Sequence, residues 1–131
     1  MPGPDRRTVL TGLASAAVLW PAPALAHHGW SWTSPEFFSL TGDLVDIYIG
    51  NPHATLDLDV SGVVWRVELA PLARTLGAGF DDDVVALGAE ITAIGHRSLD
   101  PVEARMKAVR VIVGETVYDV YPERAAGIPA A

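Results

Sequence analysis

Hydrophobic and polar residues alternate in short runs along the chain after residue 40, and turn residues separate the runs. The clearest run covers residues 54–60 and reads Ala-Thr-Leu-Asp-Leu-Asp-Val. A period of two residues is typical of a β-strand that buries one face and exposes the other. Runs of the same kind predict further strands over residues 40–49, 63–69, 90–96, 106–113 and 116–120. Gly50-Asn51-Pro52 and Ser61-Gly62 provide turns between the first three strands.

One stretch between the third and fourth strands follows a different period. Pro71 stands where a helix accepts proline, at its first turn. Leu72 and Leu76 are four residues apart and therefore share one helical face. Gly77 or Gly79 ends the element, because glycine is the usual residue at a helix C-terminus. The sequence thus predicts one short helix inside an otherwise all-β chain.

The first three strands, the short helix and the next two strands follow the order of the OB-fold, a five-stranded Greek-key barrel, and the short strand over residues 116–120 comes after them. An all-β sandwich is the rival architecture. The strands lie within residues 40–121, however, and a sandwich generally needs about 100 residues. We therefore predict an all-β, OB-fold-like barrel over residues 40–121.

The first 26 residues have the three parts of a secretory signal. They are a charged start with Arg6-Arg7, an apolar run over residues 8–20, and a small-residue end at Ala24-Leu25-Ala26. The apolar run is shorter than the about 20 residues that cross a bilayer, so no stable membrane span is expected. The arginine pair resembles a twin-arginine export signal, and a general secretory signal containing two arginines is the alternative. Either signal predicts a bacterial periplasmic or secreted protein.

The mature chain would then have an extended N-terminal segment over residues 27–39 and a flexible tail over residues 122–131. The full chain carries a net charge of −7, and removal of the signal, which carries a net +1, leaves −8. Such a chain repels phosphate backbones and anionic membranes, so nucleic acid is not an expected partner. The chain has no cysteine, which excludes disulfides and cysteine-ligated metal sites.

The candidate metal ligands are the four histidines, His27, His28, His53 and His96. Cleavage after Ala26 would make His27 the N-terminal residue, whose amine and ring can chelate one ion. Copper binds such nitrogen ligands most strongly among the common divalent metals, and zinc is also suited. His53 follows the first strand and His96 ends the fourth, at the two loops that flank the usual OB-fold ligand face. A flexible, solvated terminus and ordinary turn histidines are the alternative interpretation.

Aromatic residues suggest a second kind of site. Trp30, Trp32, Tyr48 and Trp65 could bind a protein or a small ligand across the barrel face. Packing over the barrel or within its core explains the same residues without a ligand.

The carboxylates indicate solvated surface. Asp57 and Asp59 alternate on one strand face, where they can pair with Arg66 or Lys107. Asp81-Asp82-Asp83 reads as a solvated loop, since no spaced series of calcium ligands accompanies it. The chain also lacks the glycine-rich phosphate loops and the Gly-x-Ser-x-Gly nucleophile motif. We therefore expect a non-catalytic domain, while a copper oxidase-type enzyme remains an alternative.

Several short motifs together resemble a family of small exported bacterial proteins of unknown function. The resemblance covers about residues 27–120 and implies a periplasmic OB-like barrel without a known activity. The motifs that carry it are His27-His28, Asn51-Pro52-His53, Trp65-Arg66-Val67-Glu68 and the segment from Leu87 to His96. The sequence thus predicts an exported small β-barrel that binds copper or another divalent metal through histidines. The alternative is a metal-free module that binds a periplasmic protein or ligand.

Overall fold

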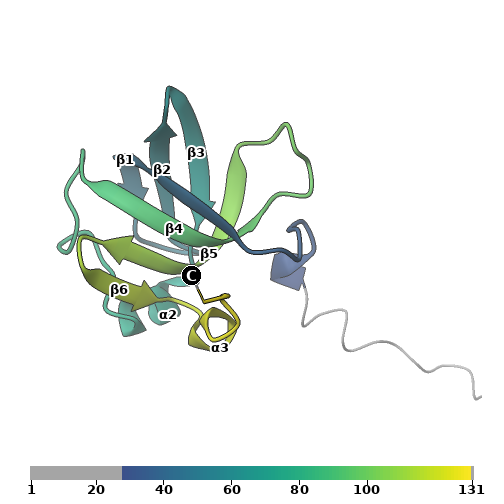
Figure 1. The fold of residues 1–131 in the computed structure, drawn as a ribbon. Helices are drawn as coiled ribbons and strands as arrows, with labels where there is room; N and C mark the ends of the chain where they lie inside the picture. The colour runs from purple at the N-terminus through teal and green to yellow at the C-terminus, as the bar shows by residue number, and fades with distance from the viewer. Residues whose placement is uncertain (1–27, 131) are drawn as a thin grey trace, which may run out of the picture. The chain divides into compact units, whose positions relative to one another are not determined.

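The computed structural model describes residues 28–130, which divide into two units (Figure 1). The first unit ends at Ser31, and its described part is a single 3-10 turn, η3, over His28–Trp30. The second unit begins at Trp32 and contains the strands and α-helices described below. Within the described residues, no helix is long and apolar enough to cross a membrane.

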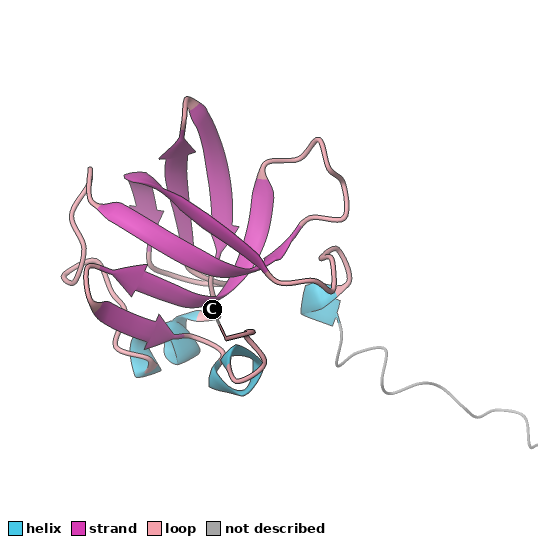
Figure 2. Ribbon diagram, viewed as in Figure 1, coloured by secondary structure: helices cyan, strands magenta, loops and turns pink. Residues whose placement is uncertain are grey.

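The second unit is built on five long strands and one short one (Figure 2). Their order in the sheet is β3-β2-β1-β4-β5-β6, and β3 also pairs with β5. This extra pairing closes the first five strands into a barrel, in the connectivity of the OB-fold. The predicted fold class is therefore confirmed. The strands are β1 (Phe38–Tyr48), β2 (Thr55–Val60), β3 (Val63–Glu68), β4 (Glu90–Arg97), β5 (Arg105–Val113) and β6 (Thr116–Asp119).

Two short helices lie beside β6 at one end of the barrel (Figure 1). Helix α2 (Leu72–Gly77) joins β3 to β4 where a helix was predicted. Helix α3 (Pro122–Ala125) follows β6, in the segment that the sequence predicts to be a flexible tail. Pro122 stands in the first helical turn, and Ala125 is buried against the barrel. A helix of four residues is too short for a helical hydrophobic period to be visible in the sequence.

The barrel interior is filled by the alternating residues of each strand. Leu56 and Leu58 of β2, which the alternation predicts to face inward, are fully buried. Phe80 follows α2 and is also fully buried, with its ring edge-to-face against Tyr118 at 5.3 Å. The rest of the buried apolar cluster comprises Leu40, Leu44, Ala54, Val67, Leu69, Ile91, Ala93, Met106, Ala108 and Val111.

A β-bulge in β1 changes which residues face the core. The register moves from Leu44 paired with Leu58 to Asp46 paired with Asp57. A simple alternation would place Leu44 and Ile47 on opposite faces. The bulge inserts one residue, so Leu44 is buried and Ile47 also packs against the core, while Val45 is exposed.

A second irregularity brings β4 and β5 unusually close. The register shifts between Ile94 and Gly95, and Gly95 then lies opposite Ala108. A Cβ atom at Gly95 would lie only 2.0 Å from the Lys107 carbonyl oxygen. Glycine is required here because of this close backbone approach.

Candidate functional site

A cleft of about 450 Å³ lies on the outer face of the barrel, beside the loop that joins β1 to β2. Leu56 and Val67 face the core, so their neighbours on β2 and β3 face outward. This position is the usual ligand face of an OB-fold. The cleft is lined by Asp46, Tyr48, Asn51, Pro52, His53, Thr55, Arg66 and Glu68.

The cleft contains one histidine–carboxylate pair. The Nδ1 atom of His53 lies 3.9 Å from the Oε1 atom of Glu68. The His53 side chain is 34% exposed, whereas that of Glu68 is only 10% exposed. Tyr48 shapes the loop that carries His53, because its hydroxyl donates a 2.7 Å hydrogen bond to the Asn51 carbonyl. The loop therefore presents an accessible imidazole to a largely buried carboxylate.

Arg105 binds the other carboxylate oxygen of Glu68, Oε2. Its Nε donates to Oε2 at 2.8 Å, and its second terminal nitrogen also reaches Oε2, at 2.5 Å. The guanidinium carbon of Arg105 lies 3.7 Å from the ring centre of Trp32, a close cation–π contact. Trp32, the first residue of the second unit, thus contacts Arg105, which in turn binds the cleft residue Glu68.

Glu68 also belongs to a row of buried ionisable residues. Glu68 on β3 is the register partner of Lys107 on β5, and Lys107 is the partner of His96 on β4. All three residues are buried. Burial lowers the pKa of Lys107, while the Glu68 carboxylate acts in the opposite direction. Such burial of charged groups is costly unless they are paired, so the row is a candidate functional feature.

His96 lies under the segment that precedes β1. Its Nδ1 is 3.0 Å from the Glu36 carbonyl oxygen, and because a carbonyl only accepts, Nδ1 carries the proton. Its ring packs on Phe37 at 4.6 Å. Strand β5 separates His96 from Glu68, a backbone distance of roughly 10 Å at two strand spacings. His96 therefore does not line the cleft that contains His53.

The two N-terminal histidines belong to the first unit. His27 lies outside the described residues, and His28 is the first residue of η3 in the first unit. Trp30 ends the same turn. These predicted ligands therefore stay predictions.

The aromatic residues do not share one face. Tyr48 lines the cleft, and its register partner Thr55 faces outward as well. Trp65 pairs with the buried Leu58 and therefore faces inward, where its ring stacks on Phe38 at 5.4 Å.

Arg97 covers the rings of Trp65 and Phe38, and its guanidinium carbon lies 5.0 Å from the centre of the Trp65 ring. Its buried Nε has no hydrogen-bond partner among the residues that the structure describes, whereas one of its terminal nitrogens donates to the Pro101 carbonyl at 3.3 Å.

The acidic residues that the sequence singles out lie on β2 and in the loop after α2. Arg66 donates two hydrogen bonds to Asp57, at 2.6 and 3.3 Å, on the outer face of β2 and β3. This ion pair confirms the predicted contact.

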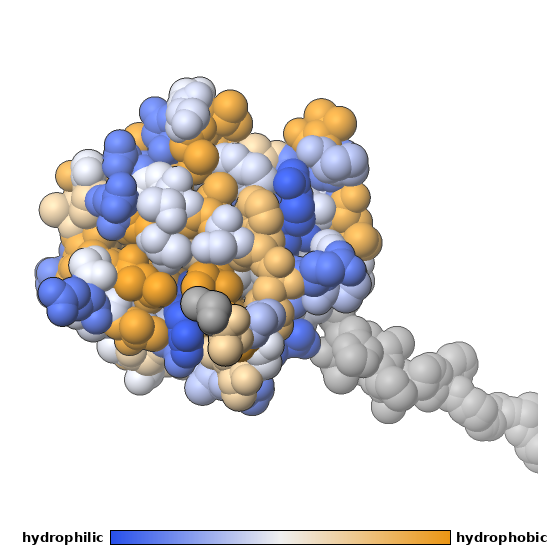
Figure 3. Space-filling model, in the orientation of Figure 1, coloured by the Kyte–Doolittle hydropathy of each residue, from blue (hydrophilic) through white to orange (hydrophobic). Residues whose placement is uncertain are grey.

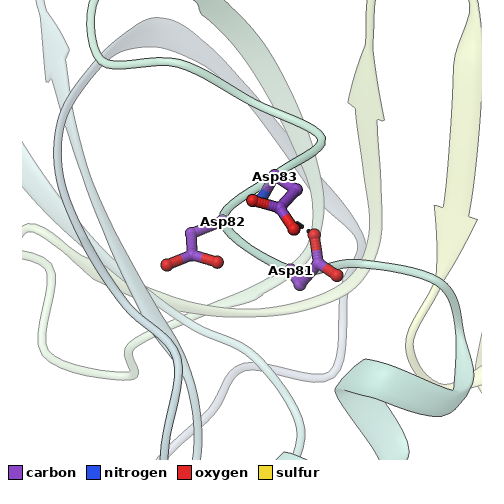
Figure 4. A group of neighbouring side chains, drawn as sticks. All are labelled: Asp81, Asp82 and Asp83. Carbon is purple, nitrogen blue, oxygen red and sulfur yellow. Dashed lines mark hydrogen bonds between the residues drawn. The ribbon is translucent and has the colours of Figure 1, made fainter.

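Asp81, Asp82 and Asp83 form a loop in which the Asp83 amide donates to the Asp81 carboxylate (Figure 4). Within residues 28–130 they are the one group of three metal-type ligands within 4.8 Å, but two of them are exposed and nothing else points to an ion.

A second cleft, of about 520 Å³, lies between α2 and α3. Arg74 and Glu123 form an ion pair of 2.8 Å across it. The Arg74 guanidinium also lies 4.9 Å from the Tyr121 ring. These contacts link the two helices, and Asp119, the remaining charged residue of this cleft, pairs with Arg110 on β5.

Exposed apolar residues gather on two neighbouring projections of the barrel. Val63 and Val64 lie at the β2–β3 hairpin, and Leu99 and Val102 lie in the loop between β4 and β5. In Figure 3, orange residues cover the tip of the right-hand projection and lie beside the pale tip of the left-hand one. The rest of the visible face mixes polar and apolar residues, as on most soluble surfaces (Figure 3).

Comparison with known proteins supplies no family. The chain matches no protein-family model, and no curated protein sequence matches it significantly. Among solved structures, it is similar to a chain of the Stn1–Ten1 complex of S. pombe, with 17% identity and a TM-score of 0.49, over 61% of this chain and 59% of that one. A mutant of TiaS in complex with agmatine is similar over 65% of this chain and 26% of that one, with 11% identity and a TM-score of 0.47. The assignment of the OB-fold therefore rests on the strand order and the β3–β5 closure described above.

Proposed function

We propose that this protein is an exported, non-catalytic OB-fold domain that binds a divalent metal ion, copper(II) above all, in the cleft beside His53. The observation that carries the proposal is the 3.9 Å distance between the His53 Nδ1 and the Glu68 Oε1. Metal–nitrogen and metal–oxygen bonds are about 2.0–2.2 Å long, so one ion can contact both atoms after a small movement of the exposed imidazole.

The remaining ligands would come from the N-terminus. His53 and Glu68 supply two ligands, and no third histidine or carboxylate within residues 28–130 completes a compact group with them. Cleavage after Ala26 would give His27 a free amine beside its ring. The His27 amine and ring, which the sequence predicts as metal ligands, would complete the set.

Export and metal binding support each other in this proposal. The pattern of residues 1–26 is that of a bacterial export signal, and the proposed site needs the terminus that its removal creates. Nitrogen ligands with one carboxylate favour copper(II) over the other divalent metals. The net charge of −8 on the mature chain also attracts cations. The domain would then act in periplasmic metal handling or as a subunit beside a redox partner.

A copper(II) titration followed by electron paramagnetic resonance tests the proposal. The protein should begin at His27, and a matched version should carry one extra N-terminal residue. We expect one-to-one binding with nitrogen couplings, weakened by the extra residue and by His53→Ala or Glu68→Gln. His96→Gln is the control, because His96 lies outside the cleft, and it should bind copper like the wild type. Weak binding that is equal in all versions would contradict the proposal.

The same cleft also fits a metal-free binding module. Its volume of about 450 Å³ lies in the range of small-molecule sites, and Tyr48 is half-exposed beside charges of both signs. A short zwitterionic peptide would match this lining. If copper does not bind, amide chemical-shift changes of Tyr48 and His53 on addition of such peptides would support this second function.

A further inference from the structure

Glu68 presents its two oxygens to different neighbours. Both contacting nitrogens of Arg105 lie on Oε2, whereas Oε1 is the atom that faces His53. A side-by-side arrangement, with one arginine nitrogen on each oxygen, would have occupied both atoms. The observed arrangement leaves Oε1 directed at the imidazole and the cleft.

The strand register explains this arrangement. Arg66 pairs with Arg105 and Glu68 pairs with Lys107 in the parallel β3–β5 contact. Met106 points into the core, so Arg105 and Lys107 both point outward, on the same face as Glu68. Arg105 therefore approaches Glu68 diagonally from one side, while His53 approaches from the cleft.

Arg105 is itself held in place. Trp32 covers its guanidinium at 3.7 Å, and the Glu103 carboxylate lies 3.9 Å from its remaining terminal nitrogen. Its side chain is about one-third exposed. Contacts on these sides limit the orientations that Arg105 can adopt, and thus the orientations of Glu68.

We propose that Arg105 is a positioning residue, which binds Oε2 of Glu68 so that Oε1 remains a single-oxygen metal ligand opposite His53, and that Trp32 clamps Arg105 in this role. The inference rests on the proposed metal site. Hydrogen bonding to a ligating carboxylate is the usual way in which a protein orients it, and its loss typically weakens metal binding about 10–100-fold. Arg105 also places a positive charge near the ion, and this electrostatic effect acts in the opposite direction.

A double-mutant cycle separates these two effects. Copper(II) affinity is measured for the protein beginning at His27, for Arg105→Gln, for Glu68→Gln and for the double variant. If Arg105 acts through Glu68, Arg105→Gln should weaken binding about tenfold or more in the wild type but have little effect beside Glu68→Gln. Arg105→Lys keeps the charge but offers a single point donor, and it should lie between the wild type and Arg105→Gln. Trp32→Leu should weaken binding in the same direction as Arg105→Gln, by a smaller factor.

Arg110→Gln is the matched control. Arg110 is also on β5 and also forms a two-bond pair, with Asp119 at 2.6 and 3.0 Å, but it lies outside the cleft. It should leave copper affinity unchanged, and thermal unfolding of every variant shows whether it is folded. Equal or tighter binding by folded Arg105→Gln, or an equal loss in the Glu68→Gln background, would overturn the positioning role while leaving the metal site intact. Absence of copper binding by the wild type would overturn both.

Discussion

Glu68 and Lys107 are register partners in the parallel pairing that closes the barrel, and both are buried on its outer face. Charged residues on an outward-facing row are normally solvated. Here Arg105, Arg124 and Tyr121 also surround Lys107, so the pair lies in a cluster of ionisable groups. The seam between β3 and β5 is therefore where the fold concentrates charge away from water.

Lys107 should make the protein more stable as the pH rises towards 10. Desolvation lowers its pKa below the ordinary value of 10.5, so the unfolded chain binds a proton more tightly than the folded one. Between the lowered pKa and 10.5, the free energy of unfolding therefore increases with pH. Lys107→Met removes this contribution, while Glu68 keeps Arg105 as its partner.

Urea unfolding of the wild type and of Lys107→Met at about pH 7 and about pH 9.5 measures the effect. The wild type should gain more stability than the variant between these two values. Groups that titrate in both proteins contribute equally to the two changes in unfolding free energy, so their contributions cancel when one change is subtracted from the other. Burial raises the pKa of Tyr121, which would cost stability only at still higher pH. An identical pH dependence in both proteins would contradict the prediction.

Lys107 should also resist chemical labelling. It is the only lysine in the chain, and it is 4% exposed. An acylating reagent that reacts with amines should therefore modify the N-terminus at neutral pH and leave Lys107 unmodified until the protein is unfolded in urea. Peptide mass spectrometry reads out both sites, and the urea-treated sample shows that Lys107 reacts once it is accessible. Rapid labelling of Lys107 in the native protein would show that the row is open to solvent.

Gly95→Ala should destabilise the barrel strongly. The new Cβ would lie 2.0 Å from the Lys107 carbonyl oxygen, and backbone cannot yield as a flexible side chain does. We expect a loss of about 3 kcal/mol or more in the free energy of unfolding. Gly77→Ala is the control, because nothing lies within 4 Å of its Cβ position. It should change stability by no more than about 1 kcal/mol, in the stabilising direction, and denaturant unfolding of both variants compares them.

Phe80→Ala tests whether the segment after α2 belongs to the core. Phe80 is fully buried and contacts Tyr118 edge-to-face. Its truncation should cost about 3–5 kcal/mol, since the barrel end would retain a cavity. Val117→Ala on the neighbouring strand is half-exposed and should cost less than about 1 kcal/mol. A small effect of Phe80→Ala would mean that the segment is loosely attached.

Most of the fold could be predicted from local patterns. The alternation over residues 54–60 placed Leu56 and Leu58 in the core, and Pro71 marked the start of α2. The bulge in β1 could not be predicted, because alternation assigns Leu44 and Ile47 to opposite faces and only pairing with β2 shows the extra residue. Helix α3 was missed, since four residues carry no period.

The candidate site could be predicted only in part. His53 and Tyr48 stand out as a turn histidine and an exposed aromatic residue, and both line the cleft. The ion pair between Glu68 and Arg105 could not be predicted, because Glu68 lies on the third predicted strand and Arg105 in the predicted loop before the strand over residues 106–113, 37 residues further along the chain. Trp65 was expected on the ligand face, but its register with Leu58 turns it inward.

The sequence by itself determined where the strands and turns lie, the buried face of a regular strand such as β2, and the order that defines an OB-fold, because these depend on residues within a few positions of one another. Only the tertiary structure decided that β3 meets β5, which places Glu68 beside Arg105 and Lys107 and leaves one carboxylate oxygen facing His53. Strand pairing between distant segments depends on how the whole barrel closes, and closure is a property of all five strands together.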